Sequence, residues 1–214
     1  MVFALPKDLV AKQIRKRKQP LQGRSRATVD AVLEATLQLL LSGGVARLNT
    51  TRIAEKAGVS VGTLYQYFPD KQSLLMAIKT HYVERVMGGI HALLVSQIGQ
   101  PLDHAFPLVV RGVLRIKHEN IRFTQAMQAA GDWPPKDKAS QVAAQQLVHA
   151  MEALILAAHP KLADVSTKAA VLVTAIDGAI TAAVIRDATR LADPAFADAL
   201  VSLALGFARS LDRP

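Results

Sequence analysis

Residues 49–75 read NTTRIAEKAGVSVGTLYQYFPDKQSLL, and this stretch decides the fold of the N-terminal region. Asn49 or Thr50 can cap a short helix, and Gly58 stands where the C-terminus of that helix needs a left-handed residue. Ser60 is a suitable N-cap for a second short helix. Two short helices joined by a tight, glycine-containing turn predict a helix-turn-helix.

The second of these helices has an apolar face and a polar face. Val61, Leu64 and Phe68 are spaced at i, i+3 and i+7, so we expect them to face inward. The outer surface is left to Gly62, Thr63, Tyr65, Gln66 and Tyr67. A glycine lets the start of the helix approach a groove, and the amide of Gln66 can pair with the edge of an adenine. These features predict a DNA-reading helix; the alternative is that the tyrosines only pack between helices.

The segment from Ala27 to Leu75 resembles the DNA-binding region of the tetracycline-repressor (TetR) family. The resemblance rests on IAEKAGVSVGTLYQYFPDK at 53–71, on the amphipathic VDAVLEATLQLLLSGG at 29–44 and on SLL at 73–75. It covers about a quarter of the chain. It implies an all-α homodimer with a helix-turn-helix in each subunit, an intersubunit bundle built from the last two helices, and an effector pocket among the middle helices.

The same resemblance implies which residues contact DNA. Phosphate contacts would fall on Thr50, Thr51, Ser60, Thr63, Tyr65, Tyr67 and Lys71, and Gly62 would approach the groove. Val61 departs from the family because it is not polar, so its contact would be apolar. The expected partner is a double-stranded, inverted-repeat operator, and the expected function is repression that a small-molecule effector relieves. The residues themselves leave repressor and activator open.

Positive charge is concentrated at the N-terminus. The chain has a formal net charge of +9, and residues 1–26 hold eight basic residues and one acidic residue, a net +7. The basic residues of this arm include Arg15, Lys16, Arg17, Lys18, Arg24 and Arg26. Such an arm suits a polyanion, with nucleic acid ahead of an anionic membrane; a solvated tail is the alternative.

Apolar residues recur at helical spacing along the rest of the chain, and strand signals are nearly absent, so we predict an all-α fold. Nine helices are expected, at about 28–41, 50–57, 61–68, 71–98, 102–118, 121–130, 138–158, 166–191 and 194–211. The expected domains are the basic arm (1–26), the helix-turn-helix domain (27–72) and an effector-binding and dimerisation domain (73–214).

The helix expected over 166–191 is apolar nearly all round, so more than one of its faces must be buried. We expect a second subunit to cover it, with a core position in its own chain as the alternative. Asp177 in this helix needs a partner, which we expect across the bundle.

The effector pocket is the least marked feature of the sequence. Its candidate residues are Tyr82, Phe106, Arg111, Phe123, Met127 and His149, and residues of these types more often occupy ordinary core or surface positions. Trp133 beside two prolines is expected to close the end of a helix. The scarcity of aromatic residues favours an aliphatic or acyl ligand.

Other classes of function find little support. The chain contains no GxSxG, HExxH or phosphate-binding glycine motif and no pair of catalytic carboxylates, so neither an enzyme nor a cofactor is expected. The six histidines form no i,i+3 or i,i+4 pair and cysteine is absent, so no metal site is expected. A membrane-surface protein anchored by the basic arm would not account for residues 49–75. The absence of a secretory or spanning signal predicts a cytoplasmic protein.

Overall fold

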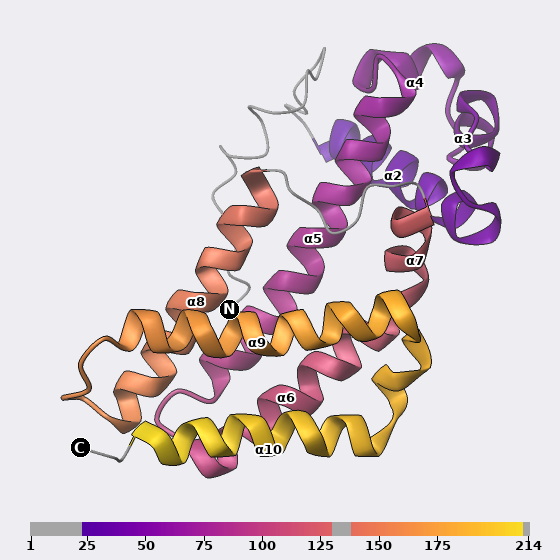
Figure 1. The fold of residues 1–214 in the computed structure, drawn as a ribbon. Coiled ribbons are helices and arrows are strands. Elements are labelled where there is room, and N and C mark those ends of the chain that lie inside the picture. The colour runs from indigo at the N-terminus through magenta and orange to yellow at the C-terminus, as the bar shows by residue number, and fades with distance from the viewer. Residues whose placement is uncertain (1–22, 130–137, 212–214) are drawn as a thin grey trace. The chain divides into compact units, whose positions relative to one another are not determined.

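The computed structural model describes residues 23–129 and 138–211 (Figure 1). In these ranges the chain forms nine α-helices and two short 3₁₀ helices and no strand, which confirms the all-α prediction. The α-helices are α2 (Gly23–Gly43), α3 (Thr50–Lys56), α4 (Val61–Tyr67), α5 (Lys71–Ser96), α6 (Leu102–Glu119), α7 (Ile121–Ala129), α8 (Lys138–Ala158), α9 (Val165–Arg186) and α10 (Pro194–Leu211). The 3₁₀ helices are η1 (Val45–Arg47) and η2 (Ala188–Ala192).

The chain forms two compact units, and α5 belongs to both. Unit 1 extends to Glu84 and takes up the chain again over Arg122–Ala139. Unit 2 comprises Arg85–Ile121 and Ser140–Pro214. Unit 1 therefore contains α2, α3, α4, the first half of α5 and α7. The domain boundary that the sequence predicts between residues 72 and 73 remains a prediction.

The N-terminal part of unit 1 packs α2, α3 and α4 around a small apolar core. Val32, Ile53 and Leu64 are fully buried, and Leu40 and Phe68 are nearly so. The one buried hydroxyl of α2, that of Thr36, donates to the Val32 carbonyl at 2.7 Å. The buried Thr36 hydroxyl thus keeps a hydrogen bond, as burial requires.

Helix α2 begins at Gly23, five residues before the expected start at residue 28. The residues that precede Thr28 are compatible with a helix, and no proline or glycine separates them from it after Gly23. Arg24 and Arg26 of the expected arm therefore lie in α2, where Arg26 is exposed. Arg15, Lys16, Arg17 and Lys18 lie outside the described residues, as does Trp133.

The rest of unit 1 joins α5 to α7 through one aromatic residue. Tyr82 stacks on Phe123 with ring centroids 3.8 Å apart and 19° between the planes. The Tyr82 hydroxyl and the Thr124 hydroxyl share a buried hydrogen bond of 2.8 Å. Arg122 at the start of α7 donates to the Leu41 carbonyl near the end of α2 at 3.1 Å. These contacts fix the first half of α5 within unit 1.

Unit 2 is a helical layer in which α10 packs most extensively against α6, and α9 and α10 run alongside each other (Figure 1). At Gly112 of α6, an added Cβ would collide with the Leu93 side chain of α5, so this glycine permits close approach of the two helices.

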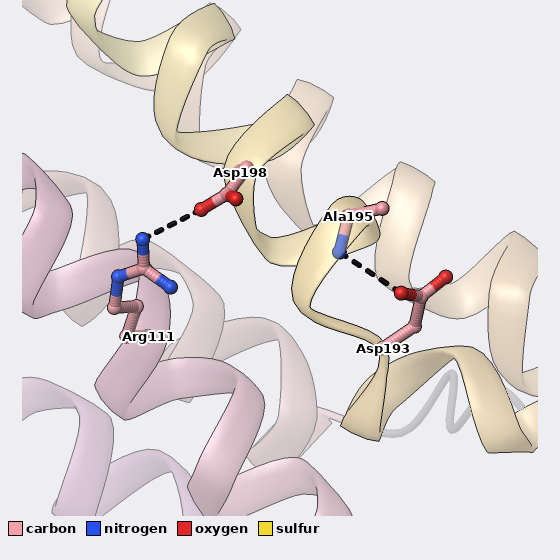
Figure 2. A network of polar contacts seen from close by, with 4 residues as sticks. All are labelled: Arg111, Asp193, Ala195 and Asp198. Carbon is pink, nitrogen blue, oxygen red and sulfur yellow. Dashed lines mark hydrogen bonds and ion pairs between the residues drawn. The ribbon is translucent and has the colours of Figure 1, made fainter.

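Two ion pairs tie α6 to the C-terminal helices. The Arg111 guanidinium pairs with the Asp198 carboxylate of α10 at 2.6 Å (Figure 2). About one turn earlier, the Asp193 carboxylate accepts the Ala195 N–H and caps the start of α10. Lys117, with 10% of its side chain exposed, donates to Asp177 of α9 at 3.0 Å. Asp177 thus has its partner, from α6 of its own chain, and its side chain is 54% exposed rather than mostly buried.

The helix expected over 166–191 ends earlier, at Arg186. Asp187 caps η2 and accepts hydrogen bonds from both the side-chain hydroxyl and the backbone N–H of Thr189, the second residue of η2. The pKa of the Asp187 carboxyl is lowered, first by the hydrogen bond from the Thr189 hydroxyl and next by the bond from the Thr189 N–H. The charge of Arg190 also lowers this pKa, whereas desolvation raises it. The expected boundary was wrong because an aspartate followed two residues later by threonine competes with the helix for the same backbone donors.

Helices α9 and α10 are long and apolar enough to cross a membrane by length and composition. Core helices of soluble proteins meet the same criterion, so it assigns no span. In the single chain, 33% of the most apolar stretch of α9 is buried, whereas the sequence predicts that more than one face of this helix is covered. Val171 and Ile185 of α9 are 57% and 52% exposed.

Candidate nucleic-acid interface

Helix α3 is capped by Asn49, which decides between the two candidates for that position. The Asn49 side chain accepts hydrogen bonds from the Thr51 N–H at 2.8 Å and the Arg52 N–H at 3.3 Å. At the other end, Gly58 has φ of +67° and the Val59 N–H donates to the Ala54 carbonyl at 2.9 Å. This left-handed glycine is the expected turn between the two helices.

Helix α4 begins as the sequence predicts. Ser60 accepts from the Thr63 N–H at 3.0 Å, and the two hydroxyls share a hydrogen bond of 2.8 Å. Leu64 and Phe68 are buried as expected, whereas Val61 is only half-buried. Val61 stands at the first position of a seven-residue helix, where the core no longer covers it.

The outer surface of α4 is polar and open. Gly62 and Gln66 are exposed, and Tyr65 is 40% exposed. The only atom within 4 Å of a Cβ added at Gly62 would be the Ser60 hydroxyl, at 3.7 Å. The start of α4 therefore presents backbone and small side chains, as close approach to a phosphate or groove requires.

The hydroxyl donors of α3 and α4 meet on this surface. The Thr50 and Tyr65 hydroxyls share a hydrogen bond of 3.3 Å, and Thr51 is exposed one residue further on. The Ser60 and Thr63 hydroxyls lie at the N-terminus of α4. Four predicted phosphate contacts thus form two hydrogen-bonded pairs of neutral donors.

Lys71, the predicted charged contact, is exposed at the first residue of α5. Its ammonium donates to the Val45 carbonyl of η1 at 3.0 Å. The helix start is stabilised by Asp70, whose carboxylate accepts the Ser73 N–H at 2.6 Å. The Lys71 ammonium therefore lies against η1, with one of its three donors already occupied.

The exposure expected for Tyr67 is wrong. This residue is 8% exposed and belongs to the buried side of α4 with Leu64. Because a seven-residue helix makes fewer than two turns, its last residue returns toward the core that Phe68 also enters. Tyr67 therefore offers little surface for a DNA contact.

The six candidate effector residues fall into different environments. In unit 1, Tyr82, Phe123 and Met127 are buried; in unit 2, Phe106 is buried, whereas Arg111 and His149 are exposed. The guanidinium of Arg111 pairs with Asp198 on the surface. The assignment of these residues to an effector pocket stays a prediction.

Unit 2 contains a cavity of about 710 Å³ that none of these six residues lines. It is a solvent-open pocket at the start of α6 and the ends of α8 and α10, and its polar lining includes Asp103, His159 and Arg209. Sequence reasoning missed this cavity because the three contributing segments are separated along the chain by about 50 residues each. Among the described residues, no group of three or more His, Asp or Glu side chains could hold a metal ion.

The geometry of residues 49–71 is that of a helix-turn-helix, and a second helical unit follows it. This combination is typical of helical DNA-binding regulators. The family model described as bacterial regulatory proteins, tetR family, matches residues 32–78. A Mesorhizobium loti protein described as a TetR-family transcriptional regulator has the same fold, with a TM-score of 0.74 and 16% identity over 88% of this chain and 98% of that one. A TetR transcription regulator from Haloarcula marismortui gives a TM-score of 0.64 and 23% identity over 86% and 97% of the two chains.

Sequence similarity to curated proteins covers only part of the chain. The HTH-type transcriptional repressor KstR of Rhodococcus jostii is 44% identical over 55 residues, which are 26% of this chain and 26% of that protein. The KstR of Mycobacterium tuberculosis is 28% identical over 127 residues, 59% of this chain and 57% of that one. The matched residues span about a quarter of the length of the Rhodococcus jostii protein. Residues 32–78 thus match the DNA-binding region of the tetR family of bacterial regulatory proteins, and the solved TetR-family structures share the fold of the chain.

Proposed function

We propose that this protein binds double-stranded DNA through α4 and represses transcription from the operator it occupies. The open polar face of α4 carries this proposal: exposed Gly62 and Gln66 stand between the hydroxyl pairs of α3 and α4. Hydroxyls and the Lys71 ammonium suit phosphates, which position a protein on DNA, and the Gln66 amide suits a base edge. The printed names of the KstR relatives favour repression over activation.

The operator is an inverted repeat, bound by a homodimer. The support for the dimer is the apolar surface that the single chain leaves uncovered on its two C-terminal helices, including Val171 and Ile185 of α9 and Leu203 of α10. A second copy would cover this surface and place two α4 helices in successive major grooves. The residues before Gly23 would add nonspecific phosphate contacts through their charge.

A small molecule bound in the helical body releases the operator. Effector release is typical of the TetR family, and a cavity of about 710 Å³ in unit 2 offers a compartment of suitable volume for a small ligand. The protein acts in the cytoplasm, where its DNA is, and performs no catalytic step of its own.

The experiment is genome-wide recovery of DNA fragments bound by the full chain, followed by titration of the recovered sequence. The expected result is a small set of fragments that share an imperfect inverted repeat, bound by two chains per repeat in light scattering. Recovery of fragments without a common sequence would overturn specific recognition. A monomer that binds one half-site with the full affinity of the repeat would overturn the dimer.

A further inference from the structure

We propose that the open pocket of unit 2 binds a small zwitterion, an aliphatic molecule with a carboxylate at one end and an ammonium group at the other. The pocket has a volume of about 710 Å³ and lies at the start of α6 and the ends of α8 and α10. The inference rests on the proposed function, which takes this pocket as the ligand site, and adds the chemistry of the ligand.

Two opposite charges line this pocket. Asp103 is the second residue of α6, and Arg209 lies in the last turn of α10. Both residues are exposed. Within the described part of the chain, neither side chain forms an ion pair, with the other or with a third residue. Each charge is therefore accessible to a ligand in the pocket.

The same two helices pair opposite charges where they touch. Arg111 of α6 pairs with Asp198 of α10 at 2.6 Å (Figure 2). Because this pair lies further along α6 than Asp103 and earlier along α10 than Arg209, the two helices run antiparallel. Toward the pocket they present a second carboxylate and a second guanidinium, which do not meet. A ligand with both kinds of charge would give each of them a partner.

The rest of the pocket lining is largely apolar. Leu102 is buried, and Leu205 and Ala208 are half-buried. Methylene groups that pack against such side chains leave water, which favours binding. A guanidinium binds a carboxylate through two parallel N–H donors, and an aspartate carboxylate accepts from an ammonium group. These features favour an aliphatic chain with a charge at each end over a purely apolar ligand, which would cover polar groups without satisfying them.

The probes are γ-aminobutyrate, ε-aminocaproate and ω-aminocaprylate, which differ only in the length of the chain between the two charges. Isothermal titration calorimetry measures their binding to the full chain in the absence of DNA. Because the two protein charges belong to helices that pack together, we expect one probe length to bind best. The alkanoate and the alkylamine of that length each lack one charge, and each should bind about tenfold more weakly, as loss of one charge-assisted hydrogen bond predicts.

Two variants remove one charge of the pocket each. Asp103→Asn and Arg209→Gln should both weaken binding of the best amino acid about tenfold. In Asp103→Asn the amino acid should bind no better than the alkanoate, and in Arg209→Gln no better than the alkylamine. Arg115→Gln and Asp164→Asn are the matched controls, because they remove exposed charges of unit 2 outside the pocket lining, and they should leave binding unchanged.

Ala158→Trp fills the pocket from an exposed position at the end of α8 and should abolish binding. Thermal unfolding checks that every variant keeps the fold. Failure of all three amino acids to bind, an alkanoate that binds as tightly as the amino acid, or equal effects of the pocket and control variants would overturn the proposal. Operator titration without a probe tests the proposed function separately: a chain that binds operator but no amino acid loses this site alone, whereas one that binds an amino acid but no operator keeps it.

Discussion

The Tyr65 hydroxyl and the Thr50 hydroxyl lie 3.3 Å apart and share a hydrogen bond that joins the outer face of α4 to the first turn of α3. Tyr65 is 40% exposed, so a phosphate oxygen can reach its hydroxyl without displacing any buried group. Either hydroxyl can donate to the other, which leaves the second free to donate to an anion. The pair therefore acts as one neutral site for a phosphate rather than as two unrelated side chains.

Tyr65→Phe should weaken operator binding by about 0.5–1.5 kcal/mol, the usual net value of one hydrogen bond. The melting temperature should change little, because the hydroxyl is exposed. Fluorescence anisotropy with labelled operator measures the affinity. Thr50→Val and the double variant complete a double-mutant cycle, in which we expect non-additive losses. Unchanged affinity for Tyr65→Phe would remove this hydroxyl from the interface.

Tyr67 should separate folding from binding because the residue is buried, whereas a phosphate contact would need only its hydroxyl. Tyr67→Ala removes core packing and should lower the free energy of unfolding by about 3–5 kcal/mol. Tyr67→Phe keeps the ring and should lose operator affinity with little loss of stability. Urea unfolding and anisotropy, measured on both variants, test the distinction. If Tyr67→Phe lowered stability while affinity stayed constant, the hydroxyl would serve the fold alone.

Lys71→Gln should weaken binding mainly at low salt. The lysine ammonium is exposed and donates to the Val45 carbonyl of η1, and glutamine removes its charge while keeping a polar side chain. Loss of one phosphate contact should reduce the slope of log affinity against log salt concentration by about 0.9. Titrations at several salt concentrations measure this slope. An equal loss of affinity at every concentration would show that Lys71 acts through the fold and not through a phosphate.

Asn49→Ala should destabilise the helix-turn-helix by about 0.5–2 kcal/mol, because the Thr51 and Arg52 N–H groups both lose their acceptor. Asn49→Asp keeps an acceptor and is the matched control, which should stay near the parent in thermal unfolding. Equal stability of the alanine and aspartate variants would contradict the capping role.

Local rules predicted most of the DNA-binding region. The Gly58 turn, the Ser60 cap and the burial of Leu64 depend on residues within a few positions of each other, so their pattern is visible in the sequence. Asn49 and Thr50 are both residue types that can cap a helix, and only the geometry of the turn shows that Asn49 is the N-cap of α3. The burial of Tyr67 was missed because it depends on where a short helix ends against its neighbours.

Long-range relationships could not be predicted from the same rules. The sequence indicated that Asp177 needs a partner, but Lys117 is 60 residues away on a helix whose neighbours no local pattern specifies. The cavity at the ends of α6, α8 and α10 is hidden for the same reason. The end of α9 at Arg186 was missed because the apolar pattern continues to Leu191, while the capping contacts of Asp187 with Thr189 decide the boundary.

If α4 reads operator DNA, its exposed Gln66 side chain is expected to contact a base, and substitution of this residue should change base preference. The measurement is the affinity of the parent and of Gln66→Ala for every single-base variant of the recovered operator. We predict that the alanine variant loses about 1–3 kcal/mol of discrimination at one base pair in each half-site, at positions related by the two-fold axis, and keeps the parent profile elsewhere. An unchanged set of affinities for the single-base variants, or an equal loss of affinity for the operator and for random DNA, would show that Gln66 of α4 reads no base.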